Sequence, residues 1–190
     1  MRKLFIILLL TGFSTQLKAQ GEQNTTKEGF FFGVGAGGGL LSLTTNDTLN
    51  TSFSTTIPNI KLGYFLTDKL AVISLLPGAT YKYNQQTRGF EAFQIGAQFW
   101  IKEKWWILVS VGLTFDAPAF YTVKDPKTAK FYVGFPAISI ASAYEIWHKN
   151  KFSLDLQYRF FYGNTEIQND GKRSGFANML ILGFNWYLNA

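Results

Sequence analysis

The stretch FSLDLQYRF, residues 152–160, decides the fold class of this 190-residue chain. Its apolar positions alternate one by one with Ser153, Asp155, Gln157 and Arg159. Such a period of two places successive side chains on opposite faces of a β-strand. The stretch therefore predicts a strand with one apolar face and one polar, partly charged face.

Two other stretches have the same period. In FQIGAQFWI, residues 93–101, apolar side chains alternate with Gln94, Gly96, Gln98 and Trp100. GFFFGVGAGGGLL, residues 29–41, contains a G-x-G-x-x-G spacing, but the Thr-, Ser- and Asn-rich residues that follow favour turns and strands over the helix that a dinucleotide site requires. We interpret it as a strand whose glycine face leaves space for long side chains from opposite strands.

The beginning of the chain predicts export. Arg2 and Lys3 precede an apolar run that is too short to span a bilayer as a helix, and small and polar residues follow it. We expect a signal peptide over residues 1–19, with an uncleaved anchor as the alternative, then a short segment (20–28) and a barrel domain (29–190). Loss of Arg2, Lys3 and Lys18 reduces the net charge from +6 to +3, which is too small for a nucleic-acid partner.

The mature chain is rich in aromatic and aliphatic residues, yet no later apolar run approaches the ~20 residues of a membrane helix. A sheet can cross a membrane only as a closed barrel, because every backbone polar group must be paired. Short and longer connectors alternate along the chain, as in outer-membrane barrels with short periplasmic turns and longer extracellular loops. We predict an all-β, eight-stranded antiparallel up-and-down transmembrane β-barrel with strands over residues 29–41, 57–66, 70–83, 90–101, 105–115, 131–147, 152–162 and 176–188. Pro77 and Pro136 fall inside these strands and predict bulges or wall above the lipid.

The two faces are assigned from the tryptophans, which all lie near short turns or the C-terminus. We expect them to form an aromatic girdle at a membrane interface, together with one tyrosine: Trp100, Trp105, Trp106, Trp147, Trp186 and Tyr187. Polar residues then face the lumen, and the predicted network is Asn59, Lys61, Glu91, Gln94, Gln98, Asp155, Gln157 and Arg159. Glu91 joins it only if a bulge turns it inward. A soluble lipocalin-like periplasmic binder, with the faces reversed, is the alternative.

Eight strands enclose only enough room for side chains, so the lumen residues must pair with one another. We expect Asp155 to pair with Lys61 or Arg159 and to help form a structural plug. A narrow path for a small solute or a hydrophobic ligand is the alternative function, since buried charges within a membrane wall favour that hypothesis.

The units LGYFLTDKLAV (62–72) and LGFNWYL (182–188) resemble those of the small eight-stranded outer-membrane β-barrels of Gram-negative bacteria, the type that also forms the membrane domain of OmpA-like proteins. The resemblance implies residence in the outer membrane, contact with its lipids and lipopolysaccharide, and insertion by the barrel-assembly machinery. Such barrels usually end on an aromatic residue, whereas Asn189 and Ala190 follow Leu188 here.

Little in the sequence indicates catalysis. Some barrels of this size resemble lipid A-modifying enzymes that use a histidine, but His148 is the single histidine and lies in a predicted periplasmic turn. The chain has no cysteine, so disulfides, a lipid-attachment cysteine and thiolate chemistry are excluded. We therefore expect no enzyme, no metal and no cofactor. Basic residues in the predicted loops, Lys124, Lys127, Lys172 and Arg173, are candidates for contact with phosphates or an extracellular partner.

Overall fold

The computed structural model describes residues 27–45, 47–56, 59–83, 86–121, 129–167 and 171–188. The predicted signal peptide and most of the segment that follows it lie outside this range. The described residues form one antiparallel sheet of nine strands. These are β1 (Phe30–Thr45), β2 (Thr48–Thr55), β3 (Asn59–Thr67), β4 (Leu70–Tyr83), β5 (Gln86–Lys102), β6 (Trp105–Pro118), β7 (Tyr132–Lys149), β8 (Phe152–Ile167) and β9 (Gly171–Tyr187). No helix in the described part is long and apolar enough to cross a membrane.

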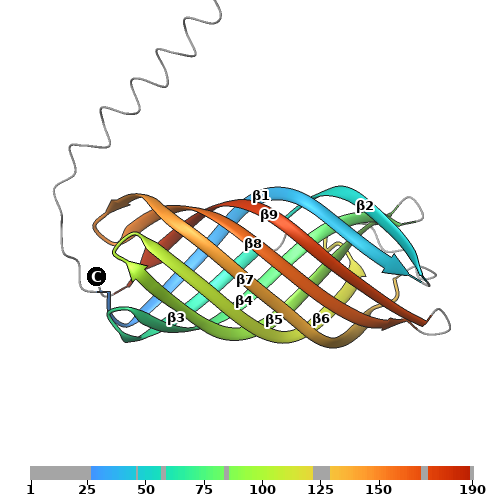
Figure 1. Cartoon of the computed structure of the whole chain (residues 1–190), viewed down its shortest axis with the longest axis horizontal. Coiled ribbons are helices and arrows are strands. Elements are labelled where there is room, and N and C mark those ends of the chain that lie inside the picture. The colour runs from blue at the N-terminus through green and yellow to red at the C-terminus, as the bar shows by residue number, and fades with distance from the viewer. Residues whose placement is uncertain are drawn as a thin grey trace, which may run out of the picture.

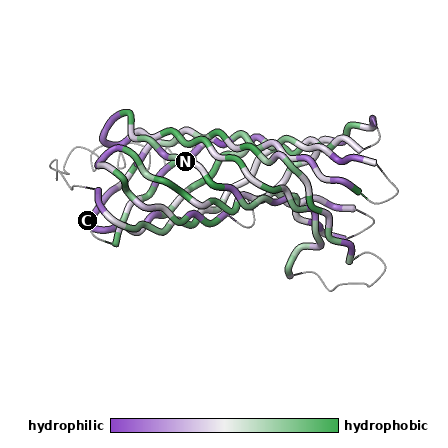
Figure 2. Tube along the Cα trace, turned by 90° about the horizontal axis from the view of Figure 1, so that it is seen from below, coloured by the Kyte–Doolittle hydropathy of each residue, from purple (hydrophilic) through white to green (hydrophobic). Residues whose placement is uncertain are grey.

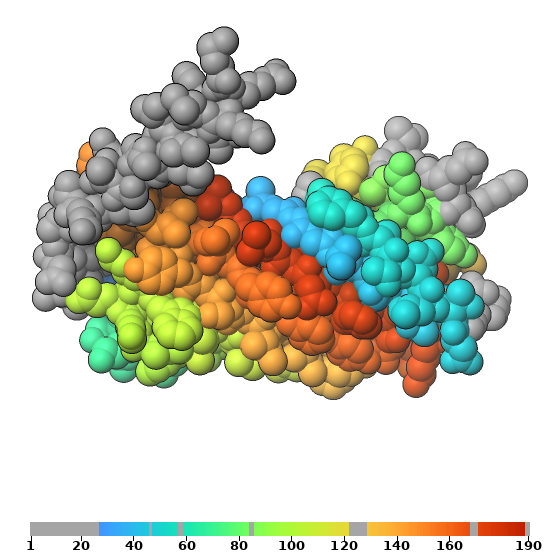
Figure 3. Space-filling model, turned by 45° about the horizontal axis from the view of Figure 1, so that its top comes forward, coloured from blue at the N-terminus to red at the C-terminus, as the bar shows by residue number. Residues whose placement is uncertain are grey.

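The sheet closes on itself through its first and last strands (Figure 1). β1 pairs with β9 from Phe31 opposite Tyr187 to Thr45 opposite Arg173. On its other edge β1 pairs first with β3 and then, beyond Gly38, with β2. Because β2 and β3 occupy successive parts of one position, the ring passes through eight positions, which confirms the predicted barrel class. Figure 3 shows neighbouring strands in contact along the outer wall.

Strands extend further at one end of the barrel than the sequence predicted. Residues 48–55, expected in a loop, form β2, and residues 163–167, also expected in a loop, belong to β8. Residues 48–55 are rich in Thr and Ser, of which Thr favours strands, and a hydroxyl pair at 2.7 Å joins Ser42 to Thr51 across β1 and β2. We call this the loop end, since it carries the longest connection, residues 119–131 between β6 and β7. The opposite, turn end carries the turns at 68–69, 103–104 and 150–151.

The two internal prolines behave differently. In the β6–β7 ladder Gly112 faces Ala137 but Thr114 faces Gly134, so Phe135 and Pro136 together oppose a single residue of β6. This bulge was predicted at Pro136 and is confirmed. Pro77 shows no register shift: β4 keeps one register with β5 on both sides of it, and Pro77 faces Asn59 beside the break between β2 and β3. The β4–β5 ladder has no pair at Leu76 and Pro77, so the missing N–H faces β5 within an unchanged register. A bulge was therefore the wrong prediction there, and a position above the lipid stays a prediction.

The charged face of β8 points into the barrel. Asp155 and Arg159 are 0% and 3% exposed, whereas Phe152 and Leu156 are 39% and 45% exposed. The same outward apolar belt continues over other strands at Val34, Leu62, Val72, Ile95, Val109, Ile140 and Leu182. Hydrophobic segments run along the wall, and hydrophilic ones gather near the ends (Figure 2). A soluble barrel would require the reverse, so the lipocalin-like alternative does not fit this structure.

Candidate functional site: a lumen filled in three layers

Glycines on β1 and β9 leave the space that the polar lumen side chains occupy. A Cβ atom built on Gly35 would lie 2.4 Å from Asn59 Nδ2, and one built on Gly183 would lie 2.2 Å from Asp155 Oδ1. Real Cβ atoms do not approach other atoms so closely, so these positions tolerate only glycine without rearrangement. Space is therefore left for long side chains, as predicted, but at Gly35 the residues that fill it come from the neighbouring strands β3 and β9 and not from the opposite wall.

The middle layer is a connected network of amides and charges. Arg159 donates from Nη2 to Gln157 Oε1 at 2.8 Å and from Nη1 to Asn59 Oδ1. Gln157 Nε2 in turn donates to Asp155 Oδ1 at 2.7 Å, and Asn185 Nδ2 donates to Asp155 Oδ2 at 2.8 Å. All of these side chains are buried, so the network fills the lumen with mutually bonded groups.

The direct ion pair predicted for Asp155 is absent from the described residues. Gln157 bridges the carboxylate and Arg159, while Lys61 donates to Gln98 Oε1 at 2.8 Å and lies 4.4 Å from the centre of the Trp106 ring. The Gln157 amide can both donate and accept hydrogen bonds, so this one side chain bonds to both charged groups and keeps them apart.

Gln94 and Glu91 complete the predicted set but lie on opposite faces of β5. Gln94 is fully buried in the lumen and accepts from Ser110 at 2.8 Å. The side chains of Phe90 and Ala92 are buried in the lumen, so Glu91 between them lies on the outer face of β5. That strand has no register shift near Glu91. The bulge needed to turn Glu91 inward is absent, so its place in the lumen network was wrong.

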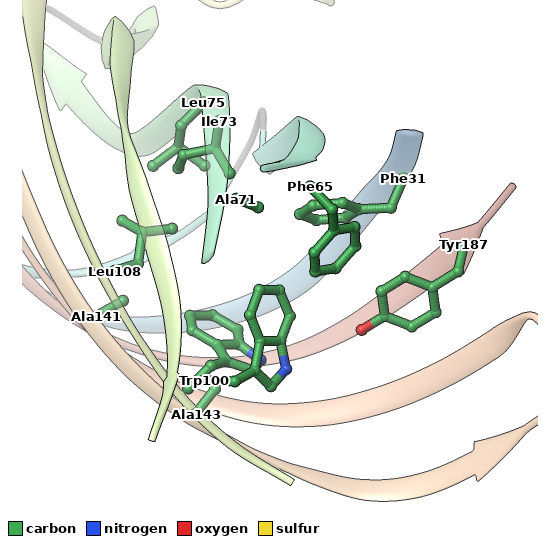
Figure 4. Packing of buried hydrophobic residues seen from close by; sticks show 11 residues of the cluster. Phe31, Phe65, Ala71, Ile73, Leu75, Trp100, Leu108, Ala141, Ala143 and Tyr187 are labelled. Carbon is green, nitrogen blue, oxygen red and sulfur yellow. The ribbon is translucent and has the colours of Figure 1, made fainter. Parts of the chain in front are cut away.

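Aromatic rings close the turn end from within. Phe31, Phe65, Trp100 and Tyr187 converge inside the barrel, with ring centres 5.0 Å apart for the Phe65–Trp100 pair (Figure 4). Lys27, just before β1, is also buried against them and lies 4.6 Å above the Trp100 ring. These rings occupy the lumen cross-section at this end.

A buried carboxylate holds the turn-end layer together. Glu145 accepts from Lys27 Nζ at 2.8 Å and from Trp100 Nε1 and the Tyr187 hydroxyl at 3.0 Å each. His148 Nδ1 lies 3.4 Å from its second oxygen. Burial lowers the pKa of Lys27 below its ordinary value, and the attraction of Glu145 opposes that shift. The N-terminal segment thus contributes a cation to the closure.

Half of the predicted aromatic girdle lies inside the barrel. Trp100, Trp106 and Tyr187 are 2%, 0% and 1% exposed, so their assignment to a membrane interface was wrong. Trp105 and Trp186 are exposed, and Trp147 is half-buried. The reason is the period of two: in each of the pairs Trp105–Trp106 and Trp186–Tyr187, adjacent residues must face opposite ways.

The loop-end layer is a charged cluster that sequence reasoning missed. Asp116, fully buried, accepts from Arg88 Nε at 2.8 Å, from Arg173 Nη1 and from the Tyr81 hydroxyl at 2.8 Å. Arg173 also donates from Nε to Thr45 Oγ1 at 2.9 Å. Four strands thereby meet at one carboxylate. The sequence singled out Arg173 only as a loop cation for external phosphates, whereas its side chain points inward.

Metal-binding clusters are absent from the part of the chain that the structure describes. No group of three or more His, Asp or Glu side chains there is arranged to hold a metal ion. His148 stacks on Tyr187 with ring centres 5.8 Å apart and contacts Glu145 and the Asn150 carbonyl. These contacts belong to the turn-end closure.

No family model matches the sequence, and neither does any curated protein. Among solved structures, the chain is similar to Ail, the attachment invasion locus protein of Yersinia pestis, with 14% identity over 84% of this chain and 99% of that chain and a TM-score of 0.50. It is also similar to Neisserial surface protein A, with 14% identity over 85% of this chain and 100% of that one and a TM-score of 0.54. At this identity the likeness concerns the fold, and with the outward apolar belt it makes the chain a small eight-stranded β-barrel of the outer-membrane type.

Proposed function

We propose that this protein is a sealed barrel of the Gram-negative outer membrane, without catalytic activity, whose loop end makes contacts at the cell surface. The observation that carries this proposal is the continuous filling of the lumen by the three layers. Each layer has its own hydrogen-bonded carboxylate: Glu145 at the turn end, Asp155 in the middle and Asp116 at the loop end. The name of Ail, an attachment protein of similar fold, agrees with a surface role.

Conductance across a planar bilayer tests the seal. We expect the refolded protein to give no channel events, and we expect Arg159→Ala, which removes a cation from the middle layer, to give at most brief openings. The exposed residue Tyr158 offers a matched control, since Tyr158→Ala alters the lipid-facing side of the same strand. Steady wild-type openings that disappear in Arg159→Ala would overturn the sealed-lumen proposal.

A narrow solute path is the second candidate, and one observation favours it. Three buried N–H donors in the lumen have no partner in the described part: Gln94 Nε2, Trp106 Nε1 and Arg159 Nε. Buried donors without protein partners usually bond to water, and a file of water could carry a small solute or protons. Proton flux into vesicles without ion conductance would favour this function over the sealed barrel.

Membrane insertion has its own test. A closed barrel resists detergent at room temperature and migrates faster on a gel than its heated form. We expect this heat-modifiable migration in the outer-membrane fraction. A single band in the periplasmic fraction would contradict the membrane assignment. It would not test whether the lumen is sealed.

A further inference from the structure

We propose that a notch in the wall at the loop end binds the phosphorylated headgroup of an outer-leaflet glycolipid. The proposal rests on the surface role proposed above and names its partner. The notch exists because two neighbouring strands separate. The β7–β8 ladder runs from Lys149 only as far as Ile138 opposite Tyr162, so the outer end of β7 pairs with β6 alone. Beyond that point β8 pairs with β9.

The bulge at Phe135 and Pro136 lies where this ladder ends. The two strands still touch at Gly134, where a built Cβ atom would lie 1.9 Å from the Asn164 carbonyl oxygen, and the notch opens beyond that contact. A cavity of about 660 Å³ occupies the gap, lined on one side by Lys130, Phe131 and Val133 and on the other by Glu166, Ile167 and Lys172. At that end of the barrel part of the wall bends away from the axis (Figure 2). The cavity is therefore a cleft between strand ends, and Tyr132 in its lining borders the loop-end layer through Arg88.

One wall of the notch continues the membrane-facing belt. Val133 and Phe135 are 43% and 64% exposed on the outer face of β7, as is Ile140 further down the strand, and Phe131, just before β7, is 60% exposed. Large exposed apolar side chains in this position suit acyl chains, and the cavity opens beside them. An occupant that has its apolar part in the lipid and its polar part in the notch fits this arrangement.

The polar side of the notch carries excess positive charge. Lys130 and Lys172 have no ion pair or side-chain hydrogen bond within the described residues, and neither does Glu166, which faces Lys172 across the β8–β9 ladder. Behind the notch, Arg88 lies 5.6 Å from the Tyr132 ring and donates to the Lys130 carbonyl at 2.9 Å.

The charges can be summed over the notch and the cluster behind it. Among the described residues, the lining of the notch holds Lys130, Lys172 and Glu166, and the cluster behind it holds Arg88, Arg173 and Asp116, so each set has one positive charge in excess. A phosphate monoester carries about −1.5 to −2 charges at neutral pH and accepts several charge-assisted hydrogen bonds. It complements this excess, while the Lys130 backbone is held in place by Arg88.

The test uses full-length refolded protein in detergent and lipid A carrying two phosphates as the probe, with native mass spectrometry as the readout. We expect Lys130→Gln with Lys172→Gln to weaken binding about tenfold or more, where tenfold equals about 1.4 kcal/mol. The matched control removes the same charge at the turn end through Lys102→Gln with Lys104→Gln, and we expect it to bind as the wild type does. Glu166→Gln should bind more tightly.

Three results would overturn the proposal: equal loss in both double variants, unchanged binding by the notch variant, or equal binding of dephosphorylated lipid A. If phosphatidylglycerol competes as well as lipid A, the notch recognises anionic lipid in general and the glycolipid assignment fails. Heat-modifiable migration of each variant verifies its folding. Conductance of the same samples tests the sealed lumen independently, so a conducting protein that still binds lipid A would contradict only the earlier proposal.

Discussion

Replacing Asp116 with asparagine tests whether the loop-end cluster stabilises the closed barrel. Asp116 is fully buried and is the only carboxylate paired with Arg88 and Arg173 in the described part of the chain, and both guanidinium groups are nearly buried as well. Asparagine keeps the shape but removes the charge, so both buried cations lose the carboxylate that they share. Breaking a buried ion pair by removing one partner typically costs about 3–5 kcal/mol. Part of the cluster survives, because Arg88 still bonds to backbone carbonyls and Arg173 to Thr45. We therefore expect Asp116→Asn to lose about 3 kcal/mol of the free energy of unfolding.

Urea unfolding in lipid vesicles at neutral pH, followed by tryptophan fluorescence, measures this loss. Asp155→Asn is the matched control, because Asp155 is equally buried but accepts hydrogen bonds from the neutral amides of Gln157 and Asn185. Losing bonds of that kind costs about 1–3 kcal/mol. A loss for Asp116→Asn no greater than that for Asp155→Asn would refute the idea that charge pairing stabilises the loop end. Adding Arg173→Met to Asp116→Asn should recover part of the loss, since it removes one unpaired cation.

Two further predictions concern the packing of the lumen and which tryptophan side chains face the lipid. Gly183→Ala should lower the free energy of unfolding by about 1–3 kcal/mol, because its Cβ would lie 2.2 Å from Asp155 Oδ1 and 2.3 Å from Gln157 Nε2. The midpoint of urea unfolding measures this loss. An unchanged midpoint would show that the side chains of Asp155 and Gln157 can move aside. In variants that each keep one tryptophan, brominated lipid should quench Trp105 strongly and Trp106 weakly, since these residues are 41% and 0% exposed. Equal quenching would place both rings in the lipid.

For the central strands, the sequence predicts which side chains share a face, because apolar and polar residues alternate there without interruption. The period placed Asp155 and Arg159 on one face, the position of the tryptophans assigned that face to the lumen, and the burial of both side chains agrees. The same period, applied to Trp105 and Trp106, would have placed one of the two rings inside. The girdle prediction instead used proximity to a turn, which sets the height of a residue in the barrel but not its face.

The extent of the wall at the loop end could not be predicted in the same way. Residues 48–55 contain few apolar positions, so no alternation marks them as a strand, and their polar side chains resemble those of a loop. They form β2 because β1 continues beyond Gly38 and its free edge needs a partner. Pairing with a neighbour, and not local composition, determines the structure of this segment.

The loop-end cluster was missed for a related reason that bears on function. Arg88, Asp116 and Arg173 fell in stretches assigned to three different loops, and the contacts that join them span 28 and 57 residues along the chain. Only once the strands extend beyond their predicted ends do these residues become inward-facing wall positions. In an eight-stranded barrel each added pair of strand residues brings one more side chain to an inward position, so a longer wall also adds to the filling of the lumen. Length of wall and closure of the lumen are thus coupled, and loops that fold into strands seal the barrel that they extend.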